Sequence, residues 1–136
     1  MKTFTVNKLI RFQHCDPAGV VFTPQYFNLF TEVIEDWFSS ALLYDFNRMV
    51  LKDKNGIPVM QILAKFHNPS YLGEELEFQL TILRLREKSV SIKIIAQNSI
   101  EKKCSAKFLI GFASLKTQSR ISWDSILKEK MFEYLN

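Results

Sequence analysis

The stretch His14–Phe30, HCDPAGVVFTPQYFNLF, decides how this chain is organised, because it joins a carboxylate in a tight turn to an apolar helix. Asp16, Pro17 and Gly19 match a common type I turn signature, so these residues alone favour a carboxylate that only shapes the turn. The turn leads directly to a helix N-terminus, whose unpaired N–H groups carry partial positive charge. A carboxylate beside such donors and an apolar cavity can open an activated ester.

The predicted helix covers 24–40 and would span ~25 Å. Thr23 is expected to be its N-cap and Pro24 its first residue. Apolar residues recur at helical spacing and leave only a narrow polar strip, so the helix is expected to be largely buried. The acidic residues of this strip are Glu32, Glu35 and Asp36. A solvated strip is the favoured interpretation, and Glu32 is the second candidate for a catalytic base.

Most of the remaining chain has the period of two that is typical of strands. Strands are predicted at 2–13, 58–67, 74–86, 88–99 and 104–116. Short connections between the last four predict antiparallel hairpins. Residues 43–56 give no clear pattern beyond a turn-rich exposed link at 52–56, and a short amphipathic helix is expected at 124–135. This order predicts an α+β fold, with one strongly curved antiparallel sheet wrapped around one long apolar helix.

The length and composition predict one globular domain over 1–136, with nearly half of its residues apolar and twelve of them Phe. No apolar run reaches the ~20 residues that span a bilayer, so no membrane partner is expected. The N-terminus does not resemble a signal peptide, which favours a soluble, cytoplasmic protein. Cys15 and Cys104 do not form a disulfide framework, and a buried or half-buried thiol is favoured for both. With His14 and His67 they give no recognised metal spacing, so no metal is expected.

Basic residues gather in 84–120, which holds nine Lys or Arg against two Asp or Glu. A solvated sheet surface is the favoured interpretation for most of them. The alternative is a partner with phosphates, either a nucleic acid or a phosphorylated cofactor. Arg84, Arg86 and Lys88 surround a hairpin turn, and their parity predicts the same face as Leu76–Ile82. A charged hairpin tip and a phosphate clamp both fit this spacing.

RFQHCDPAGVVFTPQYF, residues 11–27, resembles the active-site signature of the 4-hydroxybenzoyl-CoA thioesterase family, whose members adopt the hotdog fold. The order of elements matches that fold over essentially the whole chain. The resemblance implies an acyl-CoA thioesterase in which Asp16 acts as nucleophile or as general base on water. It places the thioester oxygen against backbone N–H groups near Phe22 and Thr23, with Gly19 and Tyr26 also at the substrate.

The resemblance further implies that Arg86, Lys88 and Ser89 bind the CoA phosphates, since an Arg-x-Lys-Ser pattern does so in the hydroxybenzoyl subgroup. It implies active sites at the interface of a homodimer, with homotetramers common. No cofactor is expected beyond the coenzyme A of the substrate. Thr23 occupies a slot that usually holds Tyr in the hydroxybenzoyl subgroup and His in the Tol–Pal-associated enzymes. The acyl group therefore stays open, while the DPAG form leans to an aryl-acyl group such as hydroxybenzoyl.

Three other functions compete with the thioesterase. A hotdog dehydratase is disfavoured because His14 and His67 lie in the wrong context. A non-catalytic module that binds acyl-CoA or acyl carrier protein is the main alternative, and an intact Asp16 argues against it. A nucleic-acid binder is disfavoured because the aromatic residues have core parity and are not interleaved with basic ones on one face. Acyl carrier protein remains a possible substrate carrier.

Overall fold

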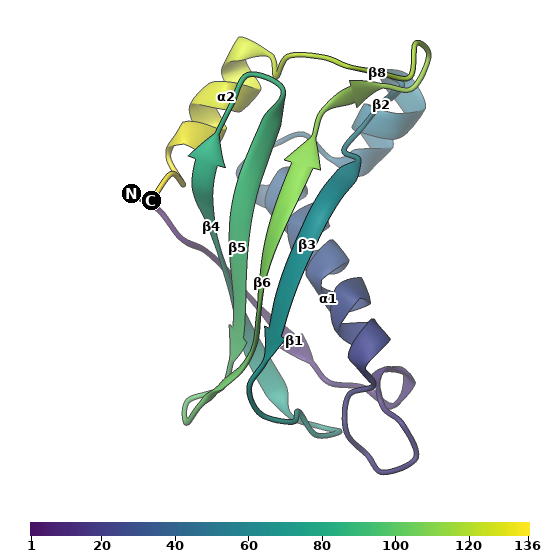
Figure 1. Cartoon of the computed structure of the whole chain (residues 1–136), viewed down its shortest axis with the longest axis vertical. Helices are drawn as coiled ribbons and strands as arrows, with labels where there is room; N and C mark the ends of the chain where they lie inside the picture. Colours follow the sequence, from purple (N-terminus) through teal and green to yellow (C-terminus); the bar gives the residue numbers. More distant parts are fainter.

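The computed structural model describes residues 1–136, and it confirms the predicted α+β hotdog architecture (Figure 1). The five-stranded antiparallel sheet has the order β1-β4-β5-β6-β3. Its strands are β1 (Phe4–Leu9), β3 (Val59–Phe66), β4 (Glu75–Leu85), β5 (Ser89–Gln97) and β6 (Lys102–Gly111). The helix α1 (Thr23–Asp36) lies along the concave face of this sheet and continues through a wider π-type turn, Trp37–Ala41.

The core lies between α1 and the inner face of the sheet, as the period of two predicts. Every second residue of β4 from Leu76 to Ile82 is fully buried, and the same holds for β5 from Val90 to Ala96. Phe30 of α1 packs edge to face with Phe78 and with Phe108, with ring centroids 6.0 and 5.9 Å apart. Such aromatic pairs contribute beyond the area that they bury.

Smaller elements close the far end of the sheet. A three-stranded sheet is formed by β2 (Asn55–Gly56), β7 (Ala113–Ser114) and β8 (Ser119–Arg120), and a helical segment covers Asn47–Lys52. The sequence pattern gave no element for 43–51. The C-terminal helix α2 (Ser125–Phe132) begins after Asp124, whose side chain accepts the Leu127 N–H at 2.8 Å. No helix of the structure is long and apolar enough to cross a membrane.

The predicted hairpin between 58–67 and 74–86 is wrong. β3 pairs with β6, and β1 takes the place beside β4, so the link from Asn68 to Glu74 crosses the end of the sheet. The backbone of this link bonds to the turn around Asp16, and those bonds explain why it does not close a hairpin. Strand 2–13 is also shorter than expected, because a 3-10 turn at Phe12–His14 follows β1 and leaves Phe12 exposed.

The predicted start of the helix is wrong by one residue. Phe22 is the N-cap, Thr23 is the first helical residue and Pro24 the second, and no side chain caps the helix. Proline still fits there, because the first-turn N–H groups have no partner within the helix.

Candidate active site

Asp16 lies at the tip of a small hairpin that delivers the chain to α1. Cys15 and Val21 form an isolated antiparallel bridge, flanked by bonds from Asp16 N–H to the Val20 carbonyl (2.9 Å) and from Phe22 N–H to the His14 carbonyl (2.9 Å). Gly19 closes the turn at φ 80°, a conformation in which a side chain would be strained. The carboxylate is therefore held on a defined turn beside the helix N-terminus.

One oxygen of Asp16 shapes the turn and the other stays free. Oδ1 accepts the Ala18 N–H at 2.9 Å, as in an Asx-turn. Oδ2 makes no hydrogen bond within the chain, and the residue is half-buried. Asp16 can therefore shape the turn through Oδ1 and still be available for catalysis through Oδ2.

The helix start offers one free backbone donor near this carboxylate. Phe22 donates its N–H to the His14 carbonyl, and Gln25 donates to the Phe22 carbonyl at 2.8 Å. Pro24 has no N–H. The Thr23 N–H has no acceptor in the chain, so it is the donor at the N-terminus of α1 that remains available to a ligand. Of the two expected oxyanion donors, the Phe22 N–H is already bonded, so the Thr23 N–H is the remaining candidate.

A second loop, residues 68–74, clasps the turn from the side. Val21 N–H donates to the Ser70 carbonyl (2.9 Å), and Leu72 N–H donates to the Gly19 carbonyl (3.0 Å). At its other end, Gly73 N–H bonds to the Ile10 carbonyl at 2.8 Å. These bonds fix the turn to the end of the sheet, so it is held more firmly than a free surface loop.

Tyr26 connects α1 to the same loop. Its hydroxyl donates to Ser70 Oγ at 2.8 Å, and both residues are buried. Burial raises the pKa of the Tyr26 phenol, while the bond to Ser70 acts in the opposite direction. The ring lies 5.6 Å from Phe66 at the end of β3. Within the single chain Tyr26 is thus a core residue whose hydroxyl is already satisfied.

Lys103 of β6 holds the loop 68–74 through its buried ammonium group. The sequence analysis did not identify this residue. Its buried Nζ donates to the Pro69 carbonyl (2.9 Å) and to Glu101 Oε1 (2.9 Å), and lies 3.4 Å from Glu74 Oε2. Glu74 in turn accepts the Tyr71 N–H at 3.0 Å. The strand was predicted to begin at 104, which left Lys103 in a link, and a lysine next to a core cysteine was the only signal available.

Neither cysteine nor His14 has the surroundings of a nucleophilic pair. His14 is buried, and its Nδ1 accepts the Arg11 N–H at 2.9 Å, so the ring holds the 3-10 turn. Burial, and then the charge of Asp16, raise the pKa of the Cys15 thiol. Burial raises the pKa of Cys104 to about 12. Both thiols are therefore protonated near neutral pH, and Asp16 is the better candidate for the chemistry.

The hairpin with Arg86, Lys88 and Ser89 is not brought to Asp16 within the chain. It joins β4 to β5 at the end of the sheet where α2 lies, whereas the turn lies at the other end (Figure 1). The 11 residues of β4 separate these ends by about 35 Å. Arg86 and Lys88 are exposed, and Ser89 is buried with its carbonyl accepting the Arg86 N–H at 2.9 Å.

Arg84 and Glu32 lie in surroundings that differ from those expected from the sequence. The predicted face of Arg84 is wrong, because a β-bulge between Ile82 and Arg84 turns it to the outer face, opposite Ser91. Glu32 lies in an ion pair with Lys8, whose Nζ is 3.4 Å from Glu32 and 2.7 Å from Asp36. Lys8 thus links Glu32 and Asp36 of the polar strip to β1, while Glu35 is exposed and has no ion pair.

Exposed apolar side chains lie on the segments that flank the turn or bond to it. Phe12, Phe22, Tyr71 and Leu72 are each at least half exposed, and backbone bonds hold their segments together. Phe66, at the end of β3, is also half exposed. Exposed aromatics gathered around a carboxylate are typical of a surface that an apolar ligand or a partner covers. The five main surface hollows of the single chain are lined by neither Asp16 nor Thr23.

Comparison with protein families gives a match over most of the chain. A family model described as the Thioesterase-like superfamily matches residues 10–131. Among curated proteins, a 1,4-dihydroxy-2-naphthoyl-CoA hydrolase of Crocosphaera subtropica is 26% identical over 100 residues, which cover 72% of either chain. A protein of the same name from Synechocystis is 32% identical over 82 residues, which cover 60% of this chain and 59% of that one.

Solved structures share the fold at lower identity. A crystal structure of a 1,4-dihydroxy-2-naphthoyl-CoA thioesterase from Synechocystis superposes with a TM-score of 0.87 at 18% identity and covers 97% of both chains. A Staphylococcus aureus protein, solved in complex with CoA, superposes with a TM-score of 0.88 at 11% identity and covers 99% of this chain and 87% of its own. At these identities the structures support the fold alone.

Proposed function

The chain belongs to the Thioesterase-like superfamily, and from this membership we propose that it hydrolyses an acyl-CoA to the free acid and CoA, with Asp16 carrying the chemistry. Membership confirms the resemblance read from residues 11–27 at the level of the superfamily, and thioester hydrolysis as the class of enzyme. The narrower 4-hydroxybenzoyl-CoA family stays a prediction. The observation that carries the proposal is a half-buried carboxylate with one free oxygen beside a helix start with one free N–H.

The free oxygen of Asp16 has two chemically balanced routes. As a nucleophile, Oδ2 adds to the thioester carbonyl, the C–S bond breaks, and water then cleaves the acyl anhydride to regenerate the carboxylate. As a general base, it takes a proton from water while the water oxygen forms the new C–O bond. In both routes a thiolate leaves, and it needs little acid assistance because its conjugate thiol is fairly acidic.

The Thr23 N–H is the proposed donor to the developing oxyanion. It stands at the first position of α1, where the helix dipole adds partial positive charge. One such donor contributes on the order of 10²–10³ in rate at comparable sites. The Thr23 N–H belongs to the same peptide as the Phe22 carbonyl, which accepts the Gln25 N–H at 2.8 Å, so the donor is oriented before the substrate arrives.

We propose an aromatic acyl group. The exposed rings of Phe12, Phe22 and Tyr71 lie on segments that flank or bond to the Asp16 turn, and such flat apolar surface suits an aryl group better than a long flexible chain. The matched relatives from Crocosphaera and Synechocystis are named for a hydroxylated naphthoyl-CoA, which is such a group. A hydroxynaphthoyl or hydroxybenzoyl thioester is therefore the first substrate to try.

We propose that the site is completed by a second copy of the chain. β3 is an edge strand, and its apolar residues Ile62, Leu63 and Phe66 are 41, 57 and 50% exposed. A long apolar edge strand is a template for pairing with another chain, and a two-fold axis would pair β3 with its own copy. Such pairing would cover Phe66, which packs beside Tyr26, and would place residues of the second copy next to the turn that carries Asp16. The predicted homotetramer would be one way to bring the Arg86–Ser89 hairpin of another copy toward this site.

The test of this function is release of free thiol from a panel of acyl-CoAs with aryl, short-chain and long-chain acyl groups. We expect efficient turnover of the aryl members and weaker turnover of the alkyl ones. Turnover of long-chain substrates alone would overturn the aryl assignment. A folded protein that binds CoA but hydrolyses no member would overturn the enzyme in favour of a binding module, and carrier-protein thioesters would then be assayed.

A further inference from the structure

A basic hollow lies on the outer face of the sheet, away from the helix. Six polar residues line it: Lys65, His67, Lys93, Lys102, Ser105 and Lys107. The hollow has a volume of about 240 Å³ and no carboxylate in its lining. It spans β3, β5 and β6. Lys93 and Lys107 point outward because their neighbours along β5 and β6 are buried in the core, and Lys65 pairs with Ser105 in the β3–β6 register.

None of the four lysines of the hollow is paired with a carboxylate. The ion pairs of the chain are formed by Lys2, Lys8, Arg48 and Lys103, and none involves a residue of the hollow. Lys93 stands directly opposite Lys107 in the β5–β6 register. Like charges in that position are destabilising, so the fold gains nothing from this pair. An anionic ligand between the two ammonium groups would remove the repulsion.

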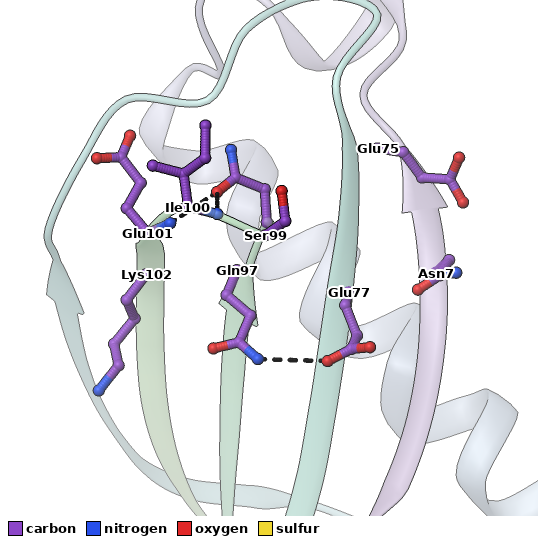
Figure 2. A pocket seen from close by; sticks show the side chains of 9 residues that line it. Asn7, Glu75, Glu77, Gln97, Ser99, Ile100, Glu101 and Lys102 are labelled. Atoms are coloured by element: carbon purple, nitrogen blue, oxygen red, sulfur yellow. Dashed lines mark hydrogen bonds between the residues drawn. The ribbon is translucent and has the colours of Figure 1, made fainter.

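Acidic residues border the hollow on the β1 and β4 side, and Glu101 stands next to Lys102 at the end of β6, where its carboxylate accepts a hydrogen bond from Lys103 at 2.9 Å. Figure 2 shows Lys102, Gln97, Glu77 and Asn7 in a row across β6, β5, β4 and β1, in agreement with the strand register. Lys102 points along β6, away from Glu75 and Glu77. The carboxylates repel an anion from the β1 and β4 side, so a bound phosphate is confined to β3, β5 and β6.

The hollow opens at the same end of the sheet as Asp16. His67 follows β3 directly and holds Ser105 Oγ at 3.2 Å. Four residues later, Tyr71 bridges to Val20 in the turn that carries Asp16. Four residues span at most about 14 Å, so the hollow and the turn are neighbours around the end of the sheet. The hairpin with Arg86 and Lys88 lies at the other end.

We infer that this hollow binds phosphate groups at the far end of the thioester substrate, the diphosphate and 3′-phosphate of CoA or the single phosphate of a carrier-bound phosphopantetheine. The inference rests on the proposed function and adds a site to it. The flexible pantetheine arm would pass around the end of the sheet beside His67, with the thioester at Asp16. The four lysines would then neutralise the phosphates without any rearrangement of the strands.

The test compares Lys93→Gln/Lys107→Gln with wild type, in binding of CoA by calorimetry and in kcat/KM. Arg86→Gln/Lys88→Gln probes the hairpin, and Lys128→Gln with Lys116→Gln is the control for exposed lysines elsewhere. The substrates are an aryl-CoA, its 3′-dephospho form and the aryl-pantetheine thioester. We expect the hollow variant to lose about three- to thirtyfold in CoA affinity, the loss of two exposed charge pairs, and to hydrolyse aryl-pantetheine as wild type does.

The outcomes separate the hollow from the function. A hollow variant that keeps wild-type CoA affinity and KM, while wild type hydrolyses aryl-CoA, overturns the inference and leaves the function standing. Loss confined to the hairpin variant overturns it as well, in favour of Arg86 and Lys88. Wild type that neither binds nor hydrolyses any thioester overturns both, and retention on DNA that the hollow variant loses would assign the lysines to a nucleic acid. If CoA and its dephospho form differ less in affinity for the hollow variant than for wild type, the 3′-phosphate binds in the hollow.

Discussion

Replacing Lys103 with methionine tests how the loop that clasps Asp16 is held. The ammonium group donates to the Pro69 carbonyl and to Glu101, and it faces the carboxylate of Glu74. Methionine fills a similar volume but leaves the Pro69 carbonyl and the Glu74 carboxylate without this partner. The change therefore removes the charge while keeping most of the packing.

The expected loss follows from what Glu74 retains. Removing one partner of a buried ion pair costs about 3–5 kcal/mol, because the other charge is left buried. Glu74 still accepts the Tyr71 N–H at 3.0 Å and the Asn98 Nδ2–H at 2.6 Å, so its charge remains partly satisfied. We therefore expect a loss of about 2–3 kcal/mol in the free energy of unfolding. For a domain of this size that lowers Tm by about 6–15 °C.

The assay is urea and thermal unfolding at neutral pH, with Lys116→Met as the control at an exposed site. The control should change stability by no more than about 0.5 kcal/mol. Glu74→Gln is then combined with Lys103→Met in a double-mutant cycle. Because the glutamine removes the unpaired charge, it should cost clearly less in the methionine background than in wild type. Wild-type stability of Lys103→Met, or equal costs of Glu74→Gln in both backgrounds, would show that Lys103 and Glu74 do not stabilise each other.

Three further predictions concern the same end of the molecule. Tyr26→Phe should lose about 1–2 kcal/mol because Ser70 Oγ stays buried without its donor, and adding Ser70→Ala should recover part of it in urea unfolding; full additivity would contradict the bond. Burial acts to raise the pKa of Glu74. The hydrogen bonds from Tyr71 and Asn98 and the charge of Lys103 outweigh burial, so the pKa of Glu74 is lowered. A lowered carboxyl pKa gives stability that is present above the ordinary value and lost as pH falls through the folded one, so wild type should lose stability below about pH 4 more steeply than Glu74→Gln; parallel curves would contradict this. Ile62→Glu on the β3 edge should give a monomer in light scattering, whereas Ile126→Glu on α2 should leave the assembly unchanged; a wild-type monomer would refute pairing through β3.

The sequence predicted the layers of the fold because hydrophobic periodicity reports burial directly. The alternation from Leu76 to Ile82 and the helical spacing around Phe30 both identify faces that are fully buried. Periodicity says nothing about which strands are neighbours, so it cannot distinguish the crossing loop 68–74 from a hairpin link. It also cannot locate a bulge, and the one before Arg84 shifted that side chain to the other face.

The candidate site was predictable only as far as its motif. Asp16 and Thr23 could be singled out because a turn and a helix start meet there in sequence. Lys103 could not, because its partners Glu74 and Pro69 lie about 30 positions away and meet it only in the folded chain. The basic hollow joins residues from β3, β5 and β6, and the excess of charge in 84–120 does not predict it, because Lys65 and His67 lie outside that segment and join it only in the folded sheet.

The most direct test of the account is the effect of Asp16→Asn on kcat with the best aryl-CoA. Asparagine keeps an oxygen that can accept the Ala18 N–H, so the turn should persist, while the free oxygen is replaced by an amide that neither attacks nor takes a proton. We expect a fall in kcat of about 10²–10⁴, with CoA affinity and Tm close to wild type and with Glu129→Gln fully active as the control. A variant that turns over at the wild-type rate would contradict the assignment of the chemistry to Asp16.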